Sequence, residues 1–401
     1  MENINVVFKF IVVAWFLASC ETETGYDAPD RLHQRIPENP AEAFLEEEHV
    51  HPQIDRIPHY DEEAITIAPE FREVDFPVSV HMLRDFLHNT DEFSYQALPA
   101  ELASAHGMDT EEFGDRLIVL HIADNQLLEI NRETGDYRRI AEQGSGPGDI
   151  AHPYGLTRSD EHLYVIGQDM RISVFDCSQW PCEFEEEIPL EYSGLGGTVF
   201  NEHIAVLSHT PLAPGGEVEL NDEAIFIYNY DGEVDAAFAP AYDTDFWLVL
   251  DMYLQGDVLY EASSEKFLVF YQHLPFLYVY NREFELDKKY HIPSFKQSRV
   301  RYDTDRHSRS VDINSLLLRI TPLSGHGDYL LTVSHRLEAE ADDAEYRTEF
   351  DYYYLNTGRQ ESSYIGSYKT GEDFHTDIQL LTDGILINEG GILKVVQPVA
   401  D

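Results

Sequence analysis

The feature that most constrains this chain is a hairpin pattern that recurs six times. Each copy is an apolar run rich in β-branched and aromatic residues, then a turn, which is long in the third and fifth copies, then a second run of the same kind. The six pairs are 117–122 with 126–131, 162–167 with 171–176, 203–208 with 224–230, 266–272 with 276–281, 329–335 with 348–355, and 384–388 with 392–397. Their spacing of about 40 to 65 residues suits four-stranded propeller blades with variable loops. We therefore predict an all-β fold, a six-bladed β-propeller.

The C-terminal end of the sequence bears on how the ring closes. The sixth pair ends shortly before Asp401, so the last blade has no room for an outer strand of its own. A propeller avoids the exposed sheet edge by taking that strand from the other end of the chain. We expect an N-terminal strand within Glu63–Ala68 to complete the last blade, and Arg72–His81 to open the first.

A glycine-rich segment, Gly-Ser-Gly-Pro-Gly-Asp-Ile, precedes the second hairpin. Glycine permits positive φ angles and close backbone approach, and proline blocks helix formation. We interpret the segment as a structural loop that returns the chain from the rim of one blade to the axis of the next. Its residues are Gly144, Gly146, Pro147, Gly148 and Asp149. A phosphate-binding loop would end in Lys followed by Ser or Thr, and this segment does not.

This loop and the hairpin after it resemble the six-bladed β-propeller lipoproteins, TolB-like or NHL-like, that are common in Bacteroidetes and related bacteria. The resemblance extends over residues 60–401, and the motif itself over 140–176. Asp149 stands where the family usually has Glu. The resemblance implies an extracytoplasmic location and a role in binding or assembly.

The first twenty residues are interpreted as a signal peptide. The apolar run 6–18 is short for a membrane-spanning helix, and it ends in Leu17-Ala18-Ser19-Cys20, which resembles a bacterial lipobox. The resemblance implies that Cys20 is acylated and that the protein is anchored to the outer membrane of the cell envelope, on its periplasmic or surface face. An ordinary signal peptide and a buried N-terminal helix are the alternatives. Residues 21–60, acidic and rich in proline, are expected to be a tether, and 61–401 the propeller domain.

The charge balance limits the choice of partner. The chain has 75 Asp and Glu against 27 Lys and Arg, a formal net charge of −48. Nucleic acid is excluded as a partner because neutralising phosphates requires clustered cations. We favour adaptation to a salty, halophilic environment as the reason for the acidity, with binding of cations or cationic ligands as the alternative.

Two cysteines flank a short turn after the second hairpin. Cys177 and Cys182 are separated by Ser-Gln-Trp-Pro, and residues so placed in adjacent strands meet the spacing of a disulfide. We predict that they are bonded. A metal pair would need neighbouring His ligands, and a redox couple would need a Cys-x-x-Cys spacing.

One stretch of this acidic chain is basic. Its residues are Lys296, Arg299, Arg301, Arg306, His307 and Arg309. We predict that they bind an anionic partner such as a carboxylate-bearing glycan or peptide. The alternative is that these side chains pair with the protein's own carboxylates.

The function predicted from the sequence is a lipid-anchored module that binds a protein, peptide or glycan, with no catalytic residue assigned. The alternative is a Ca²⁺- or Zn²⁺-dependent enzyme, like the six-bladed propellers that resemble lactonases or the lyase half of peptide-amidating enzymes. Its candidate ligands, Asp303, Asp305, His307, His326 and Asp328, form no recognisable set. The sequence requires no cofactor, although Ca²⁺ would be compatible with it. A third hypothesis is that the protein is a structural subunit of an envelope complex.

Overall fold

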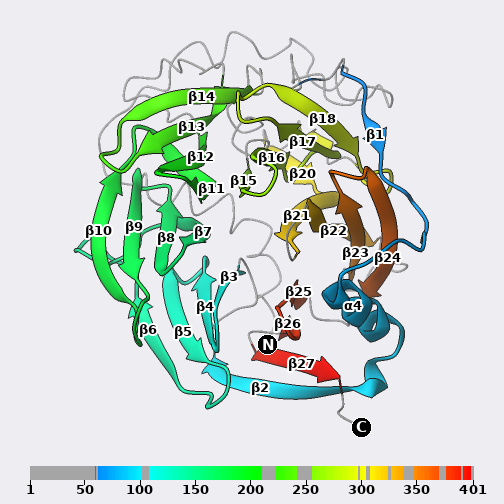
Figure 1. Cartoon of the computed structure of the whole chain (residues 1–401), viewed down its shortest axis with the longest axis horizontal. Helices are drawn as coiled ribbons and strands as arrows, with labels where there is room; N and C mark the ends of the chain where they lie inside the picture. Colours follow the sequence, from blue (N-terminus) through cyan, green and yellow to red (C-terminus); the bar gives the residue numbers. More distant parts are fainter. Residues whose placement is uncertain are drawn as a thin grey trace.

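The computed structural model shows a ring of β-sheets around a central axis (Figure 1). The structure describes residues 59, 62–101, 108–209, 223–241, 255–296, 299–303, 308–323, 327–337, 347–369, 376–389 and 392–398. These residues form six blades, which confirms the predicted six-bladed β-propeller. Among them, no helix is both long and apolar enough to cross a membrane.

The first three blades are antiparallel sheets of four consecutive strands. In each of them the first strand is nearest the axis and the fourth forms the rim. Blade one contains β3 (Met108–Phe113), β4 (Arg116–His121), β5 (Gln126–Asn131) and β6 (Tyr137–Ala141). Blade two contains β7 (Pro153–Ser159), β8 (His162–Gly167), β9 (Arg171–Asp176) and β10 (Glu183–Pro189). Blade three contains β11 (Ser193–Phe200), β12 (His203–His209), β13 (Glu223–Asn229) and β14 (Val234–Pro240).

Of the other three blades, blade five follows this plan, and blades four and six depart from it. Blade four contains β15 (Gly256–Glu261), β16 (Lys266–Tyr271), β17 (Phe276–Tyr280) and β18 (Leu286–His291), with the short β1 (Ile65–Thr66) added in parallel at its rim. Blade five contains β21 (Ser315–Pro322), β22 (Asp328–Leu337), β23 (Arg347–Asn356) and β24 (Glu361–Lys369). Blade six has β25 (Thr376–Leu380), β26 (Ile385–Glu389) and β27 (Ile392–Pro398), and its rim strand is β2 (Phe93–Glu101).

The ring closes with an N-terminal strand, as predicted, but with a different one. β2 pairs antiparallel with β27, whereas the segment Glu63–Ala68 holds only β1, which pairs with β18 of blade four. The expected opening strand, Arg72–His81, instead leads into helix α4 (Val78–His88), and β3 opens blade one. The single turn η2 (Thr90–Glu92) joins α4 to β2.

Helix α4 forms because its apolar residues follow helical spacing. Val80, Leu83 and Phe86 are buried on one face. That face packs in one hydrophobic cluster with side chains of blades five and six, including Ile365 and Val396. The helix lies between β24 and the last blade (Figure 1). It therefore wedges the last blade against its neighbour.

The six predicted hairpins are the two middle strands of each blade, and blade two shows why they read as unbroken apolar runs. Side chains of a strand point alternately to opposite faces. Leu163 and Val165 of β8 pack toward blade one, while Tyr164 and Ile166 pack toward blade three. Because each blade is sandwiched between two others, both faces of its middle strands are buried.

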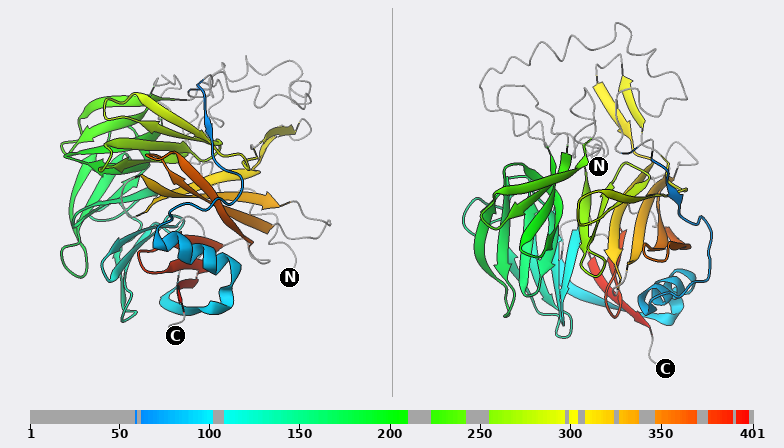
Figure 2. Two further views of the ribbon diagram at one scale, coloured as in Figure 1. Left: turned by 45° about the vertical axis from the view of Figure 1, so that its right-hand side comes forward. Right: turned by 45° about the horizontal axis from the view of Figure 1, so that its top comes forward.

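The segment before α4 is fastened to the rim of blades four and five. The ammonium group of Lys289, which is buried, donates hydrogen bonds to the carbonyl oxygens of His59 (2.7 Å) and Glu62 (3.0 Å) and lies 4.4 Å from the Phe276 ring centroid. Further along, the Ala68 amide donates to the Ser362 hydroxyl at 2.9 Å. This strap runs along the outside of the ring before α4 (Figure 2).

Candidate functional site

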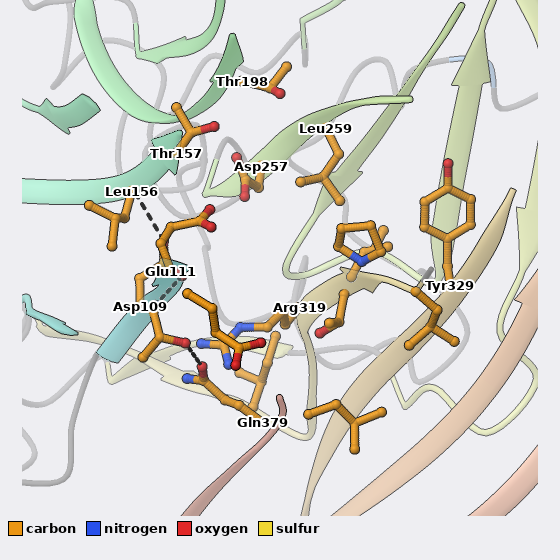
Figure 3. Close-up of a pocket in the computed structure, with 18 of the residues that line it drawn as sticks. Asp109, Glu111, Leu156, Thr157, Thr198, Asp257, Leu259, Arg319, Tyr329 and Gln379 are labelled. Carbon is orange, nitrogen blue, oxygen red and sulfur yellow. Dashed lines mark hydrogen bonds between the residues drawn. The ribbon is translucent and has the colours of Figure 1, made fainter. Parts of the chain in front are cut away.

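The innermost strands of the six blades surround an axial channel. It encloses a cavity of about 1480 Å³ that is lined by residues of β3, β7, β11, β15, β21 and β25 (Figure 3). Inner strands run in the same direction along the axis, so residues at equivalent positions in different blades lie at similar depths. Charged, hydroxyl and amide side chains from all these strands share the cavity with leucines and tyrosines.

Asp109 ties blade one to blade two at the channel wall. It is the second residue of β3, and its carboxylate accepts hydrogen bonds from the backbone amides of Thr110 and Leu156, both at 2.9 Å. Leu156 belongs to β7, so one carboxylate bridges two inner strands. The Thr110 hydroxyl donates to Oε1 of Gln379 on β25, which extends the connection to blade six. The side chains of β3 are therefore held in place from both sides.

Asp257 has the corresponding place on blade four. It is the second residue of β15, and its carboxylate accepts hydrogen bonds from the Val258 amide at 2.8 Å and from the Gly197 amide of β11. Glycine at 196 leaves the room that this carboxylate occupies, because a Cβ there would collide with Oδ1 of Asp257. A Cβ on Gly155 of β7 would lie 2.9 Å from Cα of Gly196. Small residues thus let β7, β11 and β15 approach one another closely.

Glu111 is the third carboxyl group of the channel. Its pKa is raised to about 8, mainly by burial and then by the negative charge of Asp109, while Arg158, whose Nε lies 3.4 Å from it, opposes the shift. Burial also raises the pKa of Asp257 well above its usual range, with a further contribution from Asp109 and opposition from Arg319. At neutral pH Glu111 therefore holds a proton for most of the time.

Arg319 reaches into the same channel from β21 (Figure 3). The strand shifts register between Leu317 and Arg319, a bulge that changes which side chains face the axis. The guanidinium group is close enough to Asp257 to lower its pKa. Half-buried leucines, Leu316 and Leu318, lie beside it on the same strand and line the cavity. The lining of the channel therefore combines carboxyl and guanidinium groups with half-buried leucines.

The described residues contain no group of three carboxylate, imidazole or thiol side chains that could hold a metal ion. Of the metal candidates from the sequence, Asp303 lies in the hairpin strand β19 (Arg299–Asp303), and Asp328 accepts hydrogen bonds from the Tyr354 hydroxyl and the Asn356 amide, each at 2.5 Å. Asp305, His307 and His326 lie outside the described residues.

The glycine-rich loop lies between β6 of blade one and β7 of blade two. The Asp149 carboxylate accepts a hydrogen bond from the Gly146 amide at 2.8 Å, and the Asp149 amide donates to the Gly146 carbonyl at 3.0 Å. Gly148 has a φ of 81°, which favours glycine. A Cβ on Gly144 would overlap the Asp149 side chain. Together with Pro147 these residues form a compact turn, and their contacts are with the protein itself.

Cys177 and Cys182 form the predicted disulfide, with their Cα atoms 4.2 Å apart. The turn that they close also latches blade two to blade one. Arg116 of β4 donates a hydrogen bond to the Cys177 carbonyl at 2.5 Å and pairs with the buried Glu129 at 2.9 Å. The other oxygen of Glu129 accepts the Cys182 amide at 2.7 Å. Every oxygen of this buried carboxylate is therefore partnered, as burial of a charge requires.

The basic stretch predicted to bind an anion is a hairpin between blades four and five. Its strands are β19 and β20 (Ser308–Asp312), which stand away from the blades (Figure 2, right). Arg299 and Arg301 belong to β19 and Arg309 to β20, while Lys296 is exposed just before the hairpin. Arg306 and His307 lie outside the described residues, as do Cys20 and almost all of 21–60.

Buried polar residues of blade five hold both ends of this hairpin. The Ser315 hydroxyl, which follows β20, lies 2.7 Å from Nδ1 of His335, and Nε2 of His335 lies 3.0 Å from the Asp351 carboxylate. Before the hairpin, Ser294 accepts a hydrogen bond from the Tyr353 hydroxyl at 2.6 Å. Ser315 is only 1% exposed, so this Ser–His–Asp arrangement has no access for a substrate and serves as an anchor.

The carboxyl and guanidinium groups of the channel were not singled out from the sequence. The inner strands β3 and β15 carry no unbroken apolar run, and Asp109, Glu111 and Asp257 are three of 75 acidic residues spread along the chain. The available signal was indirect. Each inner strand must precede a predicted hairpin, so acidic residues just before 117 and 266 were candidates for the axis.

The fold and the channel define a six-bladed β-propeller with an axial cavity that is lined by both apolar and charged side chains. No family model matches the chain, and neither does any curated protein. Similar solved structures include a Bacteroides fragilis protein described as exported, with 10% identity, a TM-score of 0.48, and coverage of 84% of this chain and 100% of that one. A member of the DUF4221 family from Bacteroides vulgatus has 11% identity and a TM-score of 0.47, with coverage of 77% and 98%. A streptogramin B lyase has 10% identity and a TM-score of 0.46, with coverage of 76% and 97%.

Proposed function

We propose that this protein is a lipid-anchored, extracytoplasmic binding module whose ligand occupies the axial channel. The observation that supports this most directly is the convergence of Asp109, Glu111, Asp257 and Arg319 on one cavity of about 1480 Å³. Ligand sites are concave and mostly apolar, with a few polar groups fixed in position, and the cavity has this character. Backbone amides hold the two aspartates, so these groups are oriented before a ligand arrives.

The binding proposal is tested by filling the channel. Leu259 of β15 lines the cavity and is half-buried, so Leu259→Trp adds volume there without removing a polar group. The matched control is Tyr137→Trp, at an exposed position on β6. A thermal-shift screen of small molecules should find ligands that raise the melting temperature of the wild type and of Tyr137→Trp, but not of Leu259→Trp. Ligands that stabilise all three proteins equally would place binding elsewhere.

The location outside the cytoplasm is supported by the Cys177–Cys182 disulfide, a bond that persists in oxidising compartments. The outer-membrane anchor at Cys20 is proposed from the lipobox resemblance. Cys20→Ala should shift the protein from the membrane fraction to the soluble fraction in the native host. Unchanged membrane retention of this variant would contradict the anchor.

We propose the β19–β20 hairpin as a second surface, for an anionic protein, peptide or glycan partner. It projects from the blades, and its arginines lie on a chain that is otherwise strongly acidic. Arg299→Ser combined with Arg301→Ser should weaken retention on an immobilised acidic polysaccharide such as heparin. Equal retention of this variant and the wild type would contradict the proposal for the hairpin while leaving the channel proposal intact.

A further inference from the structure

We propose that the axial channel takes an organic cation, a protonated amine attached to an apolar body. This inference rests on the proposed ligand-binding function and names the ligand's chemistry. Two features of the channel carry it: a surplus of carboxyl groups over guanidinium groups in its lining, and half-buried apolar and aromatic side chains in the same cavity.

The first feature is the charge of the cavity lining. Backbone amides donate hydrogen bonds to Asp109 and Asp257 and orient these carboxylates, and an amide carries no full positive charge. Arg158 pairs with Glu111, and Arg319 interacts with Asp257. The lining as a whole contains seven carboxyl groups and three guanidinium groups, so full ionisation would leave four formal negative charges. A ligand with one positive charge would offset part of this negative charge in a place where water screens poorly.

The second feature is the apolar side of the cavity. Leu259, Leu316 and Leu318 line it and are only half-buried, so a hydrocarbon body packed on them would remove further apolar surface from water. Tyr154 and Tyr260 also line the cavity, and aromatic faces attract cations. A bare metal ion would leave these apolar side chains uncovered, and the described residues contain no group of side chains that could hold a metal ion.

Proton release on binding would distinguish a cationic ligand from a neutral one. In the empty channel Glu111 holds a proton because of its burial and the charge of Asp109, against the opposition of Arg158; the neighbouring Glu112, which is paired with Arg132 at 2.8 Å, adds to the rise in pKa. A bound cation favours the ionised carboxylates. Binding should therefore release protons at neutral pH and strengthen as the pH rises toward about 8. A neutral ligand would bind without this release.

The test uses three probes with the same six-carbon body and different charges: hexylammonium, hexanol and hexanoate. Each is titrated into the full-length protein by calorimetry at pH 7. Hexylammonium should bind at least about ten-fold more tightly than hexanol, and hexanoate should bind least. Proton release is measured as the difference in binding enthalpy between phosphate and MOPS buffers, and it should occur for hexylammonium alone.

Two channel variants should change the affinity for hexylammonium in opposite directions. Asp257→Asn keeps an acceptor for the Val258 amide and should weaken binding about ten-fold, whereas Arg319→Met should strengthen it by a similar factor. General damage to the fold would weaken binding in both. Asp231→Asn, on an exposed rim turn of blade three, is the matched control and should have no effect.

The outcomes separate this inference from the proposed function. One outcome is that hexanol or hexanoate binds as tightly as hexylammonium or more tightly, with this binding lost in Leu259→Trp. That result would overturn the proposal of a cationic ligand and would still support the channel as a ligand site. Binding of none of the three probes would also overturn the cation, and the thermal-shift screen with Leu259→Trp would then decide independently whether the channel binds any ligand.

Discussion

At Glu111, burial opposes ionisation more strongly than Arg158 favours it. The pKa is raised to about 8 in the folded protein, compared with an ordinary value of 4.5 for an exposed glutamate. A group with a raised folded-state pKa binds protons more tightly in the folded state than in the unfolded state. Its contribution to stability is therefore complete below pH 4.5 and is lost as the pH rises through about 8. Asp257 acts in the same direction.

This residue-scale argument predicts how stability depends on pH. Glu111 should make the urea midpoint of the wild type fall between pH 5 and pH 8. Glu111→Gln should remove this contribution to the fall, because glutamine does not titrate. Glu133→Gln, at an exposed turn of blade one, is the control and should keep the wild-type slope. Midpoints measured at three pH values in this range check the prediction. A slope that is the same in both variants would contradict it.

At the scale of the element, the residue types that an inner strand can accommodate are limited by a different factor from those of a middle strand. Middle strands are selected for apolar side chains on both faces, whereas β7 and β11 are limited by how closely their backbones approach. Gly155 has no room for a Cβ, since the obstacle is Cα of Gly196 in the next blade, 2.9 Å away. Backbone atoms of a packed strand cannot move aside without disturbing the blade.

Gly155→Ala is therefore expected to destabilise the protein by about 1 to 3 kcal/mol, the usual cost of overpacking. Gly146→Ala is the matched control, because the nearest obstacle there is the flexible Asp149 side chain at 3.0 Å. The control should cost clearly less. Urea unfolding of both variants at one pH measures the difference, and an equal loss in the two would show that the approach of β7 to β11 is not tightly constrained.

The same contrast explains which elements the sequence could predict. The hairpin 162–167 with 171–176 coincides with β8 and β9, because buried middle strands leave a pattern of β-branched and aromatic residues. Asp257 follows a glycine and precedes mixed residues, so β15 shows no such pattern. Its role depends on Gly197 of another blade, a contact that no local pattern encodes.

For the whole molecule, closure of the ring by an N-terminal strand is predicted from the sequence, but the predicted segment is wrong, because β2 closes the ring. Ala-Ile-Thr-Ile-Ala within Glu63–Ala68 alternates as a half-buried strand does, yet it is added to the rim of blade four. The residues of α4 carried a signal for a helix, since Val80, Leu83 and Phe86 are three residues apart. Recognising it would have moved the closing strand beyond His88. Which apolar segment reaches the last blade is settled by packing between distant parts of the chain.

The net charge of −48 also acts at this scale. Carboxylates distributed over one compact body repel one another, and the screening length falls from about 10 Å at 0.1 M salt to about 3 Å at 1 M. We expect the urea midpoint at pH 7 to rise as sodium chloride increases over this range, and to rise much less near pH 4, where many carboxylates are protonated. A midpoint that is flat or falling at pH 7 would argue against adaptation to salt.

Closure of the ring yields the prediction that bears on the architecture as a whole. Phe93 begins β2, is 8% exposed, and packs edge-on against Phe86 of α4 at 5.4 Å between ring centroids. Phe93→Ala should therefore cost about 3 to 5 kcal/mol, because it opens a cavity where β2, α4 and the last blade meet. Ile65→Ala, in the 36% exposed position of β1, should cost less than about 1 kcal/mol. Urea unfolding of both variants compares the two segments directly. A larger loss for Ile65→Ala would contradict this prediction, because it would mean that stability depends more on the addition of β1 to blade four than on the closure of the last blade by β2.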